Sequence, residues 1–150
     1  MLTLVSRVEC ANDGSTRGPL DILLVDDEPT VGTVTAEGLR QRGHRVVLAA
    51  TIAKARADLT DKSFDVILLD LQVADERGED LILSLRASGY PMPSVVIVSA
   101  RPTLLIQTAV NEIGAAAYVQ KPCVVGEIEA VMHRVLCESI AHQPSIDQDA

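Results

Sequence analysis

Five short, mostly apolar runs alternate with longer, more polar segments along the chain: residues 20–25, 45–49, 65–69, 94–98 and 115–119. Several of these runs are continuous rather than alternating, which is typical of strands covered on both faces of a sheet. The segments between them carry apolar residues at helical spacing. Strands that alternate with helices predict a parallel sheet with right-handed crossovers and helices on both faces.

Four of the five runs end in polar residues suited to handling a phosphate: Asp26 and Asp27 after the first, Asp70 after the third, Ser99 closing the fourth and Lys121 just after the fifth. The second run ends in Ala49, Ala50 and Thr51, so it fits best at an edge of the sheet. We therefore predict an α/β fold, a flavodoxin-like doubly wound (βα)5 parallel sheet with strand order 2-1-3-4-5. Ligands of such sheets bind beyond the carboxyl ends of the strands.

The length of 150 residues predicts one domain with a single core. Residues 1–19 are polar and turn-rich, and we expect them to form a flexible N-terminal arm. Residues 139–150 lack apolar periodicity and are expected to form a C-terminal tail. The folded domain is expected over residues 20–138, with no effector domain after it.

The formal net charge is −8, and the chain has two tyrosines, one phenylalanine and no tryptophan. Nucleic-acid binding needs clustered cations or stacking aromatic residues, so we expect no direct contact with nucleic acid. No run approaches the length of a membrane span or a secretion signal, which predicts a cytoplasmic protein without membrane contact. Cys10, Cys123 and Cys137 are odd in number and widely spaced, and we expect reduced thiols rather than a disulfide frame or a zinc site.

Adjacent carboxylates at the end of a buried strand suggest a metal site. The negative charges of Asp26 and Asp27 repel each other, and a divalent cation would relieve the repulsion. Mg²⁺ prefers oxygen ligands from one or two carboxylates, water and phosphate. The pair alone is equally consistent with a helix N-cap. Asp70 is expected to converge with the pair, and the three acids together favour a metal ligand or nucleophile site.

Four stretches of the chain, together with Gly78, resemble the response-regulator receiver domains of bacterial two-component signalling: residues 22–28, 66–71, 98–100 and 118–122. The resemblance extends over residues 20–138 and points to a stand-alone, single-domain receiver. It implies a signalling switch in which Asp70 takes a phosphoryl group from a sensor histidine kinase or a phosphotransfer protein. It also implies no turnover of a separate substrate, only self-phosphorylation and self-dephosphorylation at Asp70.

The resemblance implies a metal site as well. Mg²⁺, with Mn²⁺ as a substitute, would be held by Asp26, Asp27, Asp70 and the backbone carbonyl of Gln72, with Asp26 acting through water.

Lys121 would pair with the phosphate, and the Lys121–Pro122 peptide would be cis. Ser99 would turn toward the phosphate, and Tyr118 would move inward as Ser99 vacates its space.

Two positions near the site depart from the family pattern, and two others flank the site. Ala74 stands where a proline is usual, and Cys123 stands where a phenylalanine is common and is expected to pack in its place. Gln72 and Arg101 flank the site, and we expect them to tune the lifetime of the phosphoryl group.

The resemblance places the output surface on the fourth helix, the fifth strand and the fifth helix. Leu104, Leu105 and Ile106 make the fourth helix unusually apolar, and the three side chains cannot all face the core. We expect this surface to bind a downstream protein target or a second copy of the chain after phosphorylation.

Two other functions remain open from the sequence. A Mg²⁺-dependent aspartate-nucleophile phosphohydrolase would need a second acid two positions after its nucleophile, but Asp70 is followed by Leu71 and Gln72. A pseudo-receiver that only binds partners is less consistent with the intact set of acids, hydroxyl and lysine. A dinucleotide-binding unit is weaker still, because no Gly-x-Gly-x-x-Gly motif follows any strand.

Overall fold

The computed structural model describes residues 9–10 and 16–141. Five parallel strands form its central sheet, in the order β4-β3-β5-β8-β9. Their bounds are β3 Asp21–Val25, β4 Arg45–Ala49, β5 Val66–Leu69, β8 Ser94–Ser99 and β9 Ala117–Gln120. Counted along the chain, these strands have the predicted order 2-1-3-4-5, so the flavodoxin-like topology is confirmed, with the second strand at the edge.

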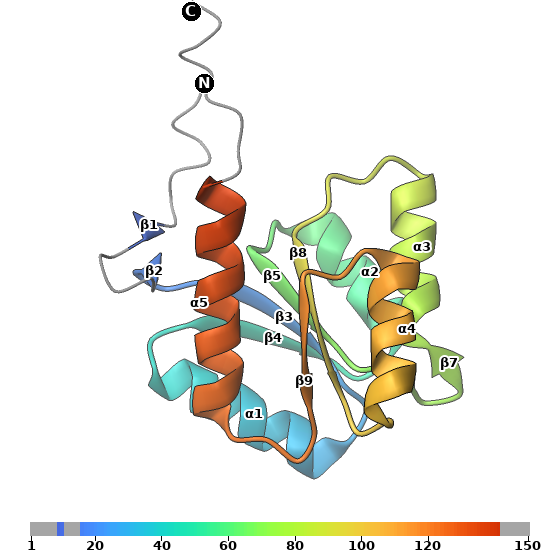
Figure 1. The fold of residues 1–150 in the computed structure, drawn as a ribbon, viewed down its shortest axis with the longest axis horizontal. Helices are drawn as coiled ribbons and strands as arrows, with labels where there is room; N and C mark the ends of the chain where they lie inside the picture. The colour runs from blue at the N-terminus through green and yellow to red at the C-terminus, as the bar shows by residue number, and fades with distance from the viewer. Residues whose placement is uncertain (1–8, 11–15, 142–150) are drawn as a thin grey trace, which may run out of the picture.

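Five helices cover the two faces of the sheet (Figure 1). Their bounds are α1 Pro29–Gln41, α2 Ile52–Asp61, α3 Gly78–Ala87, α4 Thr103–Ile113 and α5 Val125–Ala141. Helices α1 and α5 pack on one face, and α2, α3 and α4 pack on the other. Helix α4 ends at Gly114, which adopts the left-handed conformation that a residue without a Cβ takes without strain.

The central strands are apolar along most of their length because each face of the sheet has its own core. Along β3, Leu23 and Val25 point toward α2, α3 and α4, whereas Ile22 and Leu24 point toward α1 and α5. The alternation continues along β5 and β8, whose central residues are also buried. Burial of apolar surface on both sides explains why these strands appear in the sequence as continuous runs.

The N-terminal and C-terminal segments contain structure that the sequence did not predict. Strands β1 (Glu9–Cys10) and β2 (Thr16–Arg17) pair in antiparallel fashion within the predicted arm and pack against α5. Helix α5 extends to Ala141, three residues into the predicted tail. The rest of that tail, residues 142–150, lies outside the described residues.

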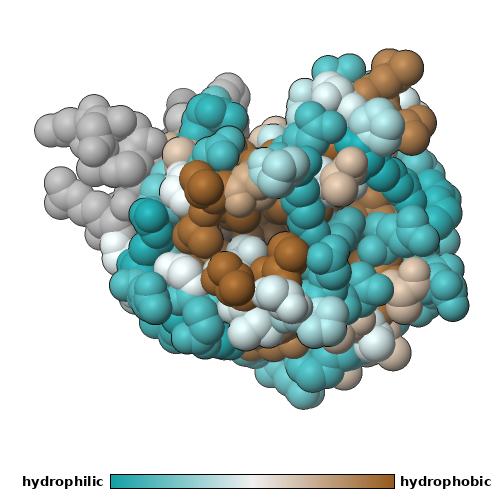
Figure 2. All heavy atoms as spheres, turned by 90° about the horizontal axis from the view of Figure 1, so that it is seen from below, coloured by the Kyte–Doolittle hydropathy of each residue, from teal (hydrophilic) through white to brown (hydrophobic). Residues whose placement is uncertain are grey.

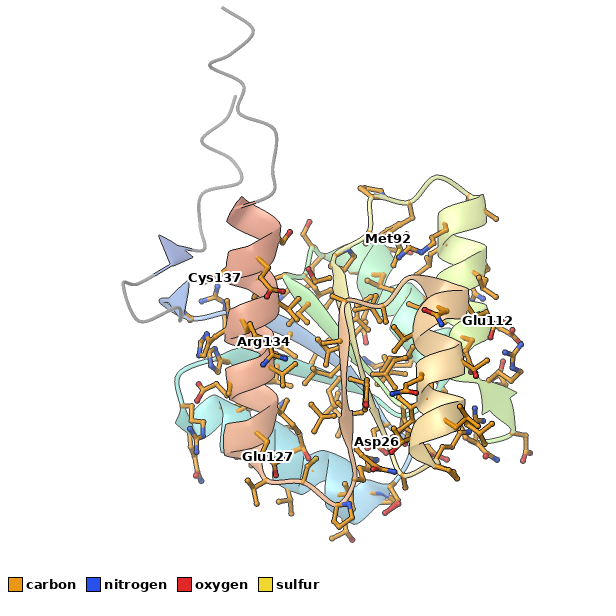
Figure 3. The ribbon with its side chains drawn as sticks, viewed as in Figure 1. Asp26, Met92, Glu112, Glu127, Arg134 and Cys137 are labelled. Carbon is orange, nitrogen blue, oxygen red and sulfur yellow. The ribbon has the colours of Figure 1, made fainter. Side chains whose placement is uncertain are left out.

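The prediction for the cysteines was right for one residue and wrong for another. Cys123 is a free thiol, whereas Cys137 is disulfide-bonded. Figure 3 labels Cys137 on α5. The side chain of Cys10 lies outside the described part of the structure. An odd cysteine count excludes complete pairing but leaves room for one bond, and the sequence does not show which segments pack on α5.

Helix α4 presents apolar side chains to solvent, as its sequence predicted. Ile106 is buried in the core, whereas 72% of Leu104 and 52% of Leu105 is exposed. No helix within the described residues combines the length and the hydrophobicity that a bilayer crossing requires.

The chain returns from β5 to α3 through a tight hairpin formed by β6 (Gln72–Val73) and β7 (Glu76–Arg77). Gly78 closes this hairpin and donates its amide hydrogen to the Leu71 carbonyl over 2.9 Å. A Cβ at position 78 would overlap the carbonyl oxygen of Asp70. The absence of a side chain at Gly78 therefore allows α3 to begin directly beside Asp70.

Gly78→Ala is expected to lower the free energy of unfolding by about 1–3 kcal/mol, because the added methyl group displaces backbone rather than a flexible side chain. Gly126→Ala is the matched control, since a Cβ there meets only the end of the Arg42 side chain at 3.6 Å. Urea unfolding of both variants measures the difference. Equal stability of Gly78→Ala and the wild type would contradict the steric explanation.

Candidate functional site

Three carboxylates meet at the carboxyl ends of β3 and β5. The pairing of Val25 with Leu69 sets the two strands so that Asp26 and Asp70 follow at the same level of the sheet. The Asp70 amide donates to the Val25 carbonyl over 3.0 Å, which fixes this register where the strands end. Asp26, Asp27 and Asp70 each offer an oxygen within 4.8 Å of the others. The convergence predicted from the strand ends is thus present (Figure 3 labels Asp26).

Lys121 supplies the positive charge at this cluster. Its Nζ lies 2.8 Å from Asp26 Oδ2 and 3.1 Å from Asp70 Oδ2. The Lys121–Pro122 peptide is cis, as the resemblance implied. The Lys121 amide donates to the Ser99 carbonyl over 2.8 Å, so the lysine is attached to the neighbouring strand end through its backbone as well.

Backbone amides orient the carboxylates of Asp26 and Asp27. Asp26 Oδ1 accepts the Glu28 amide over 2.9 Å just before α1, so this acid is oriented by the backbone and also faces the cluster. Asp27 Oδ2 accepts the Ala74 amide over 2.7 Å. Ala74 has a φ of 56°, a left-handed conformation that is uncommon for a residue with a side chain. Proline at this position could not donate that hydrogen bond, so the departure from the family pattern gives Asp27 a partner.

Burial and charge shift the proton affinities of the central pair in a consistent direction. Desolvation raises the pKa of Asp70, and the nearby Asp26 raises it further, against the opposing effect of Lys121. The pKa of Lys121 is also raised, because the carboxylates of Asp26 and Asp70 outweigh the effect of its burial. Ionisation of Asp70 is therefore less favourable in the folded protein than in the unfolded chain, and the charged form lowers the free energy of unfolding.

The remaining predicted site residues surround an open pocket of about 510 Å³ at this end of the sheet. Asp27, Asp70, Ser99, Arg101 and Lys121 all line it, and so does Gln72. The Ser99 hydroxyl is buried and accepts the Arg101 amide over 3.1 Å, which leaves its own proton available for donation. Tyr118 does not line this pocket and packs, partly buried, against the core that contains α4.

An apolar hollow adjoins this pocket on the side of α1. It has a volume of about 360 Å³ and is lined by Leu24, Val31, Val98, Lys121 and Cys123 among others. Figure 2 shows apolar side chains gathered around a hollow on the face seen from below. Burial and the nearby Glu127 raise the pKa of the Cys123 thiol, so this cysteine is a poor nucleophile at neutral pH.

Two groups of described side chains have the composition of a metal site, and only the acidic one fits a hard cation. The other group comprises His44, Glu129 and His133. Arg42 already binds Glu129 at 2.7 Å. His44 Nδ1 accepts the Leu20 amide, so the ring proton resides on Nε2 and is donated to Glu129. This second group is therefore a hydrogen-bonded contact between α5 and the loop before β4.

Reasoning from the sequence missed one charged residue beside the pocket. Glu79 follows Gly78 in the first turn of α3, where an acid is normally an exposed partner of the helix dipole. The residue is instead 3% exposed, and its carboxylate faces Arg101. No periodicity in the sequence distinguishes it from its exposed neighbour Asp80.

Residues 22–133 match the family model of the response regulator receiver domain. The chain belongs to this family. Receiver domains are signalling modules of two-component systems, and they typically bind Mg²⁺ at an acidic pocket of the kind that Asp26, Asp27 and Asp70 form here.

Relatives of this receiver domain are response regulators of greater length. The chain is 37% identical over 118 residues to the alginate biosynthesis transcriptional regulatory protein AlgB of Pseudomonas putida, which aligns with 77% of this chain and 25% of that protein. It is 31% identical over 133 residues to the transcriptional regulatory protein KdpE of Mycobacterium tuberculosis, with 86% and 58% covered. The chain thus spans from 22% to 58% of the length of such relatives.

Solved receiver domains share the fold. The CheY-like receiver domain protein of Methanospirillum hungatei superposes with a TM-score of 0.74 at 24% identity, over 84% of this chain and 100% of that one. The BeF3-activated receiver domain of DrrB from Thermotoga maritima gives a TM-score of 0.68 at 25% identity, over 79% and 97% of the two chains.

Asp70→Asn is expected to stabilise the metal-free receiver domain by about 1 kcal/mol at pH 7, an estimate reduced for the partial screening of the site by water. Because the pKa of Asp70 is raised on folding, its charge costs nothing below its unfolded value near 3.8 and destabilises the fold as the pH rises through the raised value. The gap between variant and wild type should therefore widen from pH 4 upward.

Urea unfolding in EDTA across this pH range measures the gap, and Asp75→Asn, an exposed acid of the adjacent hairpin, is the control. Mg²⁺ should stabilise the wild type and Asp75→Asn more than Asp70→Asn. A wild type that is more stable than Asp70→Asn in EDTA at neutral pH would contradict the electrostatic account of the site.

Proposed function

We propose that the chain is a phosphoacceptor signalling switch in which Asp70 receives a phosphoryl group from a sensor histidine kinase or a phosphotransfer protein. The observation that carries the proposal is the position of Lys121 Nζ, in contact with both Asp26 and Asp70 at the edge of an open pocket. The contact places the Lys121 ammonium group beside Asp70, where it could also bind the oxygens of a phosphoryl group attached to Asp70. A carboxylate that served only to terminate a strand would need no such partner.

In the proposed reaction, an Asp70 carboxylate oxygen attacks the phosphorus of a phosphohistidine. The new O–P bond forms as the N–P bond breaks, and the imidazole of the donor leaves with the electron pair. Lys121 offsets the charge on the phosphoryl oxygens, and the Ser99 hydroxyl donates a hydrogen bond to one of them. Attack by water on the acyl phosphate later releases inorganic phosphate and restores the Asp70 carboxylate.

The acidic cluster supports a role for Mg²⁺, with Mn²⁺ as a substitute. We propose Asp27, Asp70 and the Gln72 backbone carbonyl as direct ligands, with Asp26 acting through water. The cation would neutralise the charge that accumulates when a phosphoryl group approaches three carboxylates. Asp26 and Asp27 are already oriented by the backbone amides of Glu28 and Ala74, so their side chains have little freedom to lose on binding.

Phosphorylation would shift a conformational equilibrium through Ser99 and Tyr118. A charge-assisted hydrogen bond from Ser99 contributes about 1.5–3 kcal/mol, whereas reversal of a 1:99 population needs about 5.5 kcal/mol. Ser99 alone is insufficient, and Lys121, the cation or a bound partner supplies the remainder. Tyr118 would move inward as Ser99 turns toward the phosphoryl group.

Gln72 and Arg101 line the pocket beside Asp70 and are proposed to set how fast water reaches the acyl phosphate. Turnover in this proposal is limited to phosphorylation and dephosphorylation of Asp70 itself. The chain would act on no separate substrate and would bind no nucleic acid directly.

Incubation with acetyl phosphate and Mg²⁺ should label the wild type with one phosphoryl group per chain and leave Asp70→Asn unlabelled. The label should be lost in alkali, as expected of an acyl phosphate, and Asp75→Asn should be labelled like the wild type. Intact-protein mass spectrometry measures the stoichiometry. Sustained hydrolysis of a generic phosphomonoester would instead favour an aspartate-nucleophile phosphohydrolase, and no labelling at all would favour a pseudo-receiver.

The proposed output surface comprises α4, β9 and the side of α5 next to β9. Leu104 and Leu105 place apolar surface on it, and exposed apolar patches are typical of protein interfaces. The Thr103 hydroxyl lies 3.1 Å from Gln120 Oε1, so the start of α4 is attached to the end of β9 beside the pocket. A downstream protein target or a second copy of the chain would bind there after phosphorylation.

Leu104→Glu should weaken self-association or target capture of the phosphorylated chain by at least about tenfold, because a charge would be buried at the centre of the interface. Val34→Glu, an exposed apolar residue of α1, is the control and should have little effect. Sedimentation velocity with and without beryllofluoride measures self-association. Unchanged association and capture in Leu104→Glu would refute the assignment of this surface.

A further inference from the structure

Glu79 is a buried carboxylate in which, within the described part of the chain, one oxygen has no partner and the other makes only long contacts. Its side chain is 4% exposed, and one of its oxygens, Oε1, has no hydrogen-bond partner among the described residues. The other oxygen, Oε2, lies 3.3 Å from Arg101 Nη1 and 3.4 Å from Arg77 Nη2. Both distances are long for charge-assisted contacts. Burial of an acid with contacts this long lowers the stability of the fold, so its presence calls for a functional explanation.

Arg101 is the part of this arrangement that reaches the phosphoacceptor pocket. It lines the same pocket as Asp70, and its side chain remains 30% exposed. Its guanidinium is held by Glu79 and by a 3.4 Å contact from Nη2 to the Leu71 carbonyl. Its backbone is fixed separately, since its amide donates to Ser99 Oγ and its carbonyl accepts from Gln120. The side chain can therefore change partners while the backbone remains in place.

Arg77 provides Glu79 with a second cation. It binds Glu112 on α4 through Nη2 at 2.9 Å and Asp80 through Nη1 at 3.1 Å, while the same Nη2 faces Glu79. Glu112 lies on α4 in Figure 3. If Arg101 turned away, Glu79 would keep a positive charge within 3.4 Å rather than remain an isolated buried ion.

We propose that Glu79 is a positioning residue that holds the Arg101 guanidinium away from the unphosphorylated Asp70 and releases it to the phosphoryl group once that group is present. The inference rests on the proposed function of Asp70. A phosphoryl group adds about −1.5 to −2 charge and three strong acceptors to the pocket, and it competes for Arg101 with a carboxylate that binds the guanidinium only loosely. For Arg101 to bind the phosphoryl group, its contact with Glu79 must first be broken. The strength of that contact therefore sets the affinity of the pocket for a phosphoryl group.

Beryllofluoride, a stable mimic of the phosphoryl group, tests the proposal in the presence of Mg²⁺. Glu79→Gln removes the charge with little change in shape, and its release of Arg101 should tighten beryllofluoride binding about fivefold. Glu79→Leu removes the carboxylate and fills the buried space with an apolar side chain, so it should give the same gain if Glu79→Gln folds poorly. Asp80→Asn, an exposed acid next in the chain that binds Arg77 but not Arg101, is the matched control and should leave the affinity unchanged.

The decisive comparison repeats Glu79→Gln in an Arg101→Ala background. If Glu79 acts by holding Arg101, the gain disappears there, whereas a direct repulsion between Glu79 and the anion would preserve it. Preservation of the gain, or its absence in both single variants at Glu79, would overturn the proposal.

A second measurement uses no phosphoryl mimic. A double-mutant cycle of Glu79→Gln and Arg101→Ala on urea unfolding should show a coupling between the two side chains, and additive effects would contradict their interaction. A wild type that binds no beryllofluoride but shows the coupling would refute the proposed function, and the release of Arg101 with it. A wild type that binds beryllofluoride without the predicted pattern would refute only the role of Glu79.

Discussion

The parallel register of β3 and β5 brings like charges together, and the contact of Lys121 with two of them makes this arrangement tolerable. A carboxylate directly follows each of these strands, so neighbouring strands aligned at the same level place the acids within 4.8 Å of one another. Lys121 arrives from the end of β9 and reaches across the end of β8 to bind Asp26 and Asp70. The glycine at the hairpin allows α3 to begin directly beside Asp70. Without the ammonium group of Lys121, repulsion between the carboxylates would disfavour the strand register that packing of the apolar residues favours.

Much of this arrangement is local in origin and was therefore accessible from the sequence. Apolar runs define the strands, and the residue that follows a run must lie at a strand end, which predicted the convergence of Asp26, Asp70 and Lys121. Features that depend on which distant segments touch were not accessible. Glu79 is buried with its carboxylate facing Arg101, 22 residues away, and Cys137 is disulfide-bonded on a helix against which the N-terminal strands pack. The hydrogen bond from the Ala74 amide to Asp27 likewise joins residues 47 positions apart.

The residues of the core stabilise the fold, whereas several residues of the site destabilise it. The core gains stability from apolar side chains on both faces of the sheet, whereas the site contains a carboxylate with a raised pKa, a residue with positive φ and a buried acid without a full set of partners. Each of these features costs folding free energy, and they cluster within one pocket and its margin. Such clustering is typical of positions retained for a reason other than stability. The fold tolerates them because the strands beneath the pocket are buried along their whole length.

The segment from Ser99 to Thr103 joins this pocket to the exposed apolar surface of α4. Gln120 on β9 donates to the Arg101 carbonyl over 2.9 Å, and its side-chain oxygen lies 3.1 Å from the Thr103 hydroxyl in the first turn of α4. The same segment carries the Ser99 hydroxyl, which accepts the Arg101 amide. A change of partner at Ser99 therefore acts on a backbone that is bonded to β9 on one side and continues into α4 on the other. Leu104, which is largely exposed, lies one residue beyond Thr103, so in the proposed switch a movement of this short segment would reach the apolar surface of α4 directly.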